Sequence, residues 1–138
     1  GRRLNLTASA LQSAVSASVC AAEAEGVAVN IAVVDAGGNL AAFLRMPGAF
    51  QAPIDIAIDK AWTANSFGMA TGDFAQMLEG EQPMVRDGLL RRPRVAAFPG
   101  GHPVCMMGRL AGGIGVSGAS AAQDDSIALA GLSALMES

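Results

Sequence analysis

The sequence predicts a single α+β domain, in which an antiparallel sheet of about five strands is flanked by helices. Three observations lead to this prediction: short runs of β-branched residues, glycine turns that join them, and longer segments with apolar residues at helical spacing. Because the strands follow one another through short turns, without βαβ alternation, they favour antiparallel pairing. The 138 residues, of which 51% are hydrophobic, suffice for one core but not for two, so residues 1–138 form one domain.

The first third of the chain predicts a helix followed by a β-hairpin. Apolar residues recur at helical spacing after a cap at Thr7 or Ser9, so we expect a helix over roughly residues 8–25. A β-branched run that ends at Val34 and an apolar run over residues 40–46 then flank a glycine-rich turn. These two runs are the first pair of strands.

The middle of the chain predicts two helices and then an irregular loop. Pro53 suits the first turn of a helix because it has no amide proton, and Gly68 is a typical helix terminator. A shorter amphipathic helix is expected over residues 71–78. Glycine and proline interrupt the charged residues from Glu79 to Pro93, which indicates a long loop of the kind that serves function or faces a partner.

The last third predicts about three strands and a terminal helix. Val95 to Phe98 has the pattern of a strand, and residues 103–107 and 110–116 predict a second hairpin. Ser120 is the expected cap of the last helix. The glycines of residues 112–118 lack the spacing of a nucleotide-binding loop, and we attribute them to close backbone packing.

Composition argues against several classes of function. With 9 basic and 12 acidic residues and a pI near 4.9, the chain is a poor partner for nucleic acid. It has neither an apolar run of the ~18 residues that span a membrane nor the pattern of a signal peptide, so we expect a cytoplasmic protein without a membrane partner. Cys20 and Cys105 lie far apart without metal-ligand spacing. We therefore expect no metal site, and expect each cysteine to be a small buried side chain.

Four polar side chains lie within the otherwise apolar segment that starts at Pro53. Asp55, Asp59, Lys60 and Thr63 lie at helical spacing there. Two interpretations of Lys60 remain open: its stem extends along the surface to solvent and its ammonium pairs with an acid, or the ammonium lines a pocket.

Four segments together resemble one known family. They are AVVDAGGNLAAFLRMPGA, IDIAIDKAWTANSFG, FPGGHPV and GGIGVSGASAAQDDSIALAG. In this order they resemble the GlcG/HbpS-like family, which includes the C-terminal domain of PduO-type proteins, and the resemblance covers nearly all of residues 8–136. It implies a central antiparallel sheet flanked by helices and self-assembly into homo-oligomers. Because some members bind haem, the resemblance also implies haem or another tetrapyrrole as ligand; other members accompany catabolic or biosynthetic enzymes.

His102, the only histidine, lies between a Gly-Gly turn and Pro103, where family members often carry an aliphatic residue. On such a turn it is an exposed histidine bonded to backbone or water, a haem ligand, or a general acid or base. Arg45, which matches a family stretch, either reaches a ligand carboxylate or forms an ion pair at a strand end. Lys60 matches the family's DKA stretch, so Arg45, Lys60 and His102 form a candidate trio around an anionic ligand.

Two functional classes follow from these residues. The first is a small-ligand-binding protein whose family-implied ligand is haem or another tetrapyrrole. The second is a cofactor-free isomerase, lyase or cyclase, in which His102 transfers a proton while Arg45 and Lys60 bind an anionic substrate. A structural oligomer that contacts another enzyme through residues 79–94 is a third. The candidate ligand-binding residues are Arg45, Asp59, Lys60, Thr63, His102 and Asp124, the last pairing with Lys60 or capping the terminal helix.

Overall fold

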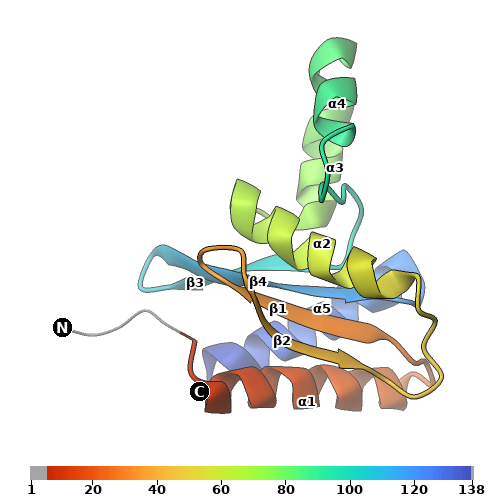
Figure 1. The fold of residues 1–138 in the computed structure, drawn as a ribbon, viewed down its shortest axis with the longest axis vertical. Coiled ribbons are helices and arrows are strands. Elements are labelled where there is room, and N and C mark those ends of the chain that lie inside the picture. The colour runs from red at the N-terminus through yellow and green to blue at the C-terminus, as the bar shows by residue number, and fades with distance from the viewer. Residues whose placement is uncertain (1–5, 138) are drawn as a thin grey trace.

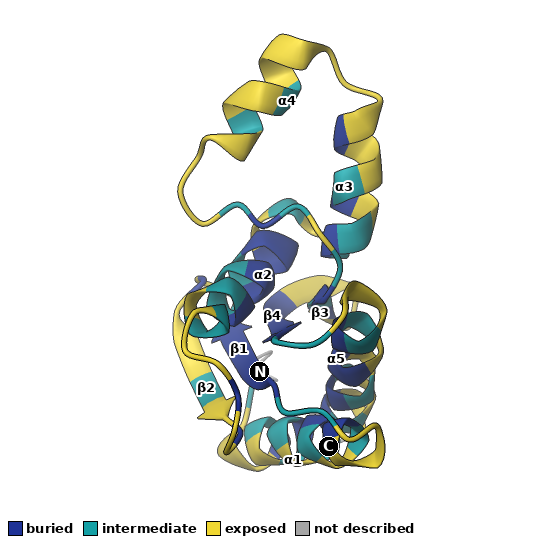
Figure 2. Cartoon of the chain, turned by 90° about the vertical axis from the view of Figure 1, so that its right-hand side faces the viewer, coloured by how far each residue is buried: buried dark blue, intermediate teal, exposed yellow. Residues whose placement is uncertain are grey.

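The computed structural model describes residues 6–137 and places one four-stranded antiparallel sheet between two helical layers (Figure 1). The strands are β1 (Asn30–Asp35), β2 (Leu40–Arg45), β3 (Gly101–Met106) and β4 (Arg109–Ser117), in the order β2-β1-β4-β3. One face of the sheet is covered by α1 (Ala8–Ala24) and α5 (Ala121–Met136), and the other by α2 (Pro53–Phe67). Beyond α2, the helices α3 (Thr71–Glu79) and α4 (Pro83–Leu90) form an arm that points away from the sheet (Figure 2).

The α+β class and most elements agree with the sequence predictions. Thr7 caps α1 by accepting a hydrogen bond from the amide of Ala10, and Gly68 ends α2 in the left-handed conformation. Ser120 and Gln123 form a capping box at the start of α5. No helix among residues 6–137 is both long and apolar enough to cross a membrane.

The sheet has four strands where about five were expected. The expected strand from Val95 to Phe98 is wrong, since this segment has no regular structure. Its backbone is bonded elsewhere: the amide of Ala96 donates to the hydroxyl of Thr63 on α2, and Arg94 just before it has a φ of 73°. A segment whose amides bind side chains of a helix cannot extend a neighbouring strand.

Two other expectations are corrected. Residues 83–90, predicted as part of an irregular loop, form the helix α4. Its apolar side chains contact no core, so its sequence lacks the periodic signal of a buried face. Cys20 and Cys105 are both exposed rather than buried. They lie on an outward side of α1 and on the edge strand β3, which are positions that the sequence alone does not distinguish from inward ones.

Small residues bring α1 and α5 together under the sheet. Ala10, Ala14, Ser18 and Ala22 recur every four residues and form the buried stripe of α1. Opposite them, Gly131 of α5 leaves no room for a Cβ beside Ser18 and Ile114. The hydroxyl of Ser18 donates to the carbonyl of Ile127 at 2.8 Å, which fixes the two helices to each other.

Glycines also let α2 lie directly on β4. A Cβ at Gly113 would overlap the carbonyl oxygen of Ala61, and one at Gly115 would overlap that of Ala57. The two alanines are completely buried. The prediction of close backbone packing at these glycines is therefore confirmed.

We expect Gly115→Ala to lower the free energy of unfolding by about 3 kcal/mol or more, because an added methyl group must displace α2 from β4. The matched control is Gly80→Ala, where the added Cβ would meet its nearest neighbour at an ordinary 3.6 Å. Urea denaturation of both variants measures the difference. Equal stabilities would show that the helix adjusts without cost and would contradict the close-packing argument.

Candidate functional site

Lys60 is the largest completely enclosed side chain of the described residues, with 1% of its surface exposed. It starts on α2, and its ammonium donates to the carbonyl of Val116 on β4 at 2.8 Å and to Oδ2 of Asp124 on α5 at 3.1 Å. Figure 2 shows that α2 and α5 cover opposite faces of the sheet, so these two bonds of Lys60 link all three layers. The expected pairing with an acid is observed, but the expected route to solvent is not.

The surroundings of the Lys60 ammonium leave it little capacity for another ligand. Burial lowers the pKa of Lys60 below its usual value, and the charge of Asp124 partly opposes this shift. The ammonium also lies 5.0 Å from the ring centroid of Phe98. Asp124 uses its other oxygen to accept from the amide of Ala119 at 2.9 Å. An anion could reach Lys60 only by displacing these partners.

His102 forms a second polar contact beside this one. Its Nε2 lies 2.7 Å from Oδ1 of Asp125, and 13% of the histidine side chain is exposed. A carboxylate at this distance holds the imidazole ring in a fixed orientation. Since Asp124 and Asp125 are consecutive at the start of α5, the two pairs adjoin. The arrangement can transfer a proton to or from a molecule that approaches β3.

Arg45 does not join this group. It lies at the end of β2, which is the opposite edge strand from β3, so two other strands separate it from His102. With adjacent strands about 4.8 Å apart, the backbones of β2 and β3 are about 14 Å apart. Its Nη1 donates to the carbonyl of Ala49 at 3.2 Å. Within one chain, Arg45, Lys60 and His102 do not surround a common ligand.

Thr63 and Asp59 organise the segment that follows the arm. The hydroxyl of Thr63 donates to the carbonyl of Arg94 at 2.8 Å and accepts from the amide of Ala96 at 3.0 Å. Asp59 lies 4.0 Å from Nε of Arg94. Burial raises the pKa of Asp59; the charge of Arg94 opposes this shift, and that of Asp55 adds to it. These contacts account for both side chains without a ligand.

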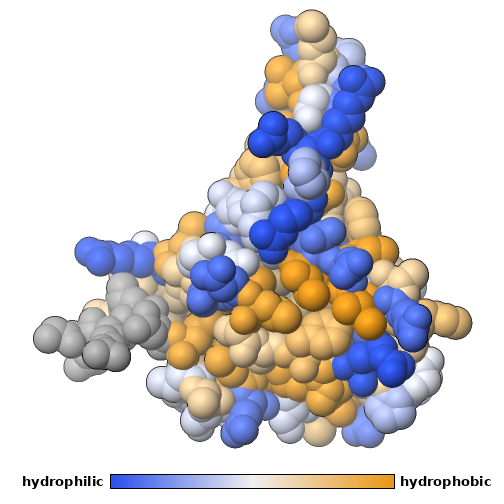
Figure 3. All heavy atoms as spheres, viewed as in Figure 1, coloured by the Kyte–Doolittle hydropathy of each residue, from blue (hydrophilic) through white to orange (hydrophobic). Residues whose placement is uncertain are grey.

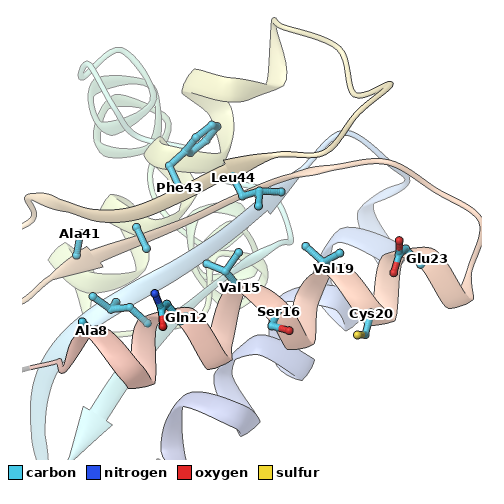
Figure 4. Close-up of a pocket in the computed structure, with 12 residues that line it drawn as sticks. Ala8, Gln12, Val15, Ser16, Val19, Cys20, Glu23, Ala41, Phe43 and Leu44 are labelled. Atoms are coloured by element: carbon cyan, nitrogen blue, oxygen red, sulfur yellow. The ribbon is translucent and has the colours of Figure 1, made fainter.

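A groove that the sequence interpretation missed runs between α1 and β2 (Figure 4). It has a volume of about 770 Å³, which is within the ~300–1,000 Å³ typical of small-molecule sites. Its lining is mostly apolar; the close-up shows Val15 and Val19 of α1 beneath Leu44 of β2. The sequence of β2 could have indicated this groove. Its residues are apolar on both faces, and an edge strand of this kind leaves one apolar face uncovered.

No cluster of histidine, cysteine, aspartate and glutamate side chains that could hold a metal ion occurs among residues 6–137. Asn30 and Asn65 are buried, and the side-chain oxygen of each has no hydrogen-bond partner in the described chain. Asn30 uses its amide nitrogen to donate to the carbonyl of Phe50 at 3.2 Å. The pairs Lys60–Asp124 and His102–Asp125 are joined through consecutive aspartates at the start of α5.

The comparisons with known proteins point to one family. Residues 6–133 match the family model described as haem degrading protein HbpS-like. The chain is 32% identical over 121 residues to an uncharacterized 15.0 kDa protein of Citrobacter freundii, covering 85% of each. It is also 32% identical to the corrinoid adenosyltransferase PduO of that organism, but spans only 39% of its length. A crystal structure of a PduOC:heme complex superposes with a TM-score of 0.86 at 32% identity, covering 94% of both chains.

We expect Lys60→Met to destabilise the protein by about 3–5 kcal/mol, because it leaves the carboxylate of Asp124 buried without a counter-charge. The double variant Lys60→Met, Asp124→Asn should lose much less than the sum of the two single variants. Chemical denaturation of the four proteins gives the coupling free energy. Strictly additive losses would mean that the pair contributes no interaction energy.

Proposed function

This chain belongs to the HbpS-like family, and on that premise we propose that it is a small-ligand-binding protein whose ligand is haem or another tetrapyrrole. The observation that carries the proposal is the apolar groove between α1 and β2. A relative of 32% identity has been solved as a complex with haem, and this supports the same ligand class here. The proposal concerns binding, and it assigns no reaction to the bound ligand.

The groove suits a flat apolar ring system better than a compact polar molecule. Leu11, Val15 and Val19 of α1 face Ala42 and Leu44 of β2 across it. Burying such surface contributes roughly 25 cal/mol per Å² of apolar area removed from water. These side chains would hold the macrocycle.

The acidic groups of a tetrapyrrole need a cation, and Arg45 is the only basic residue in α1 or β2. It follows Leu44 along β2, so its side chain leaves the other face of this edge strand, and its planar guanidinium suits a carboxylate. We propose that Arg45 binds a propionate of the ligand. Lys60 takes no part, since its ammonium is already bonded inside the core.

His102 is poorly placed to bind the iron of a haem in this groove. It lies on the opposite edge strand, and its Nε2, which projects furthest from the backbone, is bonded to Asp125. Bound haem would supply a redox-active iron. The chain itself would supply burial of the ring and a counter-charge for its carboxylates.

Self-association is part of the proposal. β2 is an edge strand whose Leu40 and Leu44 are 50% and 37% exposed, and edges of this kind are usually covered in stable proteins. The family resemblance implies a homo-oligomer as well. A second chain would also enclose a ligand that the groove alone leaves open on one side.

A second candidate function rests on the contact of 2.7 Å between His102 and Asp125. An aspartate that orients a histidine is the arrangement of a general acid or base. We propose as the alternative that the chain is a cofactor-free isomerase, lyase or cyclase for an anionic organic substrate. Arg45 lies too far from His102 to help within one chain, so the substrate's charge would need another partner.

Titration with haem, followed by visible absorption, tests the first proposal. We expect a saturable shift of the Soret band in the unaltered protein and in His102→Ala, and at least tenfold weaker binding in Leu44→Asp. The matched control is Leu129→Asp, which changes a similarly exposed leucine on α5 away from the groove. Wild-type affinity in Leu44→Asp would show that haem does not bind in the groove. Loss of binding in His102→Ala would show that His102 takes part in binding haem.

Solvent hydrogen exchange tests the alternative. A cofactor-free isomerase should catalyse exchange of carbon-bound protons in one member of a panel of 2-oxo and 2-hydroxy acids in D₂O, as followed by proton NMR. His102→Ala should lower that rate by about 10²–10⁴-fold, and Asp125→Asn should lower it less. No exchange with any acid of the panel, or exchange unchanged in His102→Ala, would contradict this assignment.

A further inference from the structure

The groove between α1 and β2 is lined by side chains that suit an apolar ring but not a metal ion. Eight of its twelve lining residues are alanine, valine, leucine or phenylalanine. Histidine, cysteine, methionine and tyrosine are the side chains that hold haem iron in proteins. Within residues 6–137, the lining of the groove includes no histidine, methionine or tyrosine, so Cys20 is its one residue of this kind.

Cys20 is poorly suited to bind iron in this groove. Figure 4 shows its sulfur on the side of α1 that faces away from Leu44 of β2, whereas Val15 and Val19 face that strand. A cysteine binds a metal as the thiolate, which a nearby cation or a helix N-terminus stabilises. In the described part of the chain, no cation lines the groove, and Cys20 lies towards the C-terminal end of α1, one turn before Glu23. The cysteine therefore forms part of the wall of the groove.

The side chains elsewhere that could bind iron are distant or already bonded. The sequence has one histidine and no tyrosine, and His102 lies on β3, at the opposite edge of the sheet. Met46 is the methionine nearest to Leu44 along the chain. It is buried, and its Sδ accepts a hydrogen bond from the amide of Val29 at 3.4 Å. The remaining methionines belong to neither α1 nor β2.

We propose that the groove recognises a tetrapyrrole through its apolar ring and its carboxylates, and not through its central metal. The ligand class is then the planar porphyrins, and a metal-free porphyrin binds as tightly as haem. Figure 3 shows hydrophobic residues gathered on this face of the molecule, over β2 and the adjoining side of α1. Burial of a ring against them removes the same apolar surface from water whether or not the ring holds a metal. The inference rests on the proposed function, because it concerns the same groove.

Glu23 sets a second condition for binding. Among the described lining residues it is the only charged one, and Figure 4 shows it beyond Val19, at the end of the groove opposite Ala8 and Ala41. A carboxylate there repels the carboxylates of a porphyrin, by an amount that salt reduces. This repulsion acts on groups that haem and metal-free porphyrin share, so it weakens the binding of both to the same extent.

Two parallel titrations test the inference. Metal-free protoporphyrin, followed by its fluorescence, and haem, followed by visible absorption, are each added to the unaltered protein. We expect dissociation constants that agree within about threefold, and displacement of one ligand by the other. Leu44→Asp should weaken the binding of both ligands at least tenfold, and the control Leu129→Asp should weaken neither.

Variants at Cys20 and Glu23 test the two polar positions of the wall. Cys20→Ser should leave the affinity for haem and the visible spectrum of the complex unchanged. Glu23→Gln should tighten the binding of both ligands by about two- to threefold at low salt, and by less at high salt. The matched control is Glu25→Gln, which removes a carboxylate from the C-cap of α1, outside the lining, and should change neither affinity.

The outcomes separate this inference from the proposed function. Haem binding that is at least tenfold tighter than porphyrin binding, or that is lost in Cys20→Ser, would overturn the inference and leave haem binding in place. An effect of Glu23→Gln on haem alone would overturn it too, because the two ligands share their carboxylates. If neither ligand binds, the proposed function fails as well.

Discussion

The contact between α2 and β4 determines how the rest of the molecule is built. Because Gly113 and Gly115 carry no side chains, the helix rests on the strand's backbone, and its Ala57 and Ala61 fill the space that larger residues would need. At this depth the side chain of Lys60 can reach past the sheet to Asp124. That ion pair holds the start of α5, and the next residue, Asp125, binds His102 on β3. The polar cluster is therefore a consequence of the close approach, and the burial of Lys60 and Asp124 makes each of these two charges dependent on the other.

The apolar groove and the histidine–carboxylate pair lie in different places, although the sequence predicted one site for ligand binding and proton transfer. The apolar groove lies on α1 and β2, whereas the only histidine and its carboxylate lie at the other edge of the sheet. Binding of a flat apolar ligand and transfer of a proton would thus use different surfaces. The arm adds a third surface, which neither chemistry needs. Such a division suits a family in which relatives include a protein solved with haem and a domain found within a corrinoid adenosyltransferase.

Most of the fold could be predicted because its signals are local. Thr7, Gly68 and Ser120 mark helix ends through their own backbone and side-chain chemistry, and the glycine turns mark both hairpins. Signals that depend on distant contacts misled the prediction: Val95 to Phe98 has strand composition, but Thr63 binds its backbone instead. The site was predicted less well for the same reason. The pairing of Lys60 with an acid follows from its apolar neighbours, but the separation of Arg45 from His102 depends on strand order, which no spacing in the sequence reports.

The ion pair of Lys60 and Asp124 also affects when the domain can fold during synthesis. Its partners are 64 residues apart in the chain. At a synthesis rate of about 5–20 residues per second, α2 leaves the ribosome roughly 3 to 13 s before the carboxylate that will neutralise its lysine. For most of that interval β4 is incomplete, and α5 is incomplete throughout it, so the lysine stays hydrated until late in synthesis. The layers can close only when α5 emerges, so folding of this domain waits for its last helix.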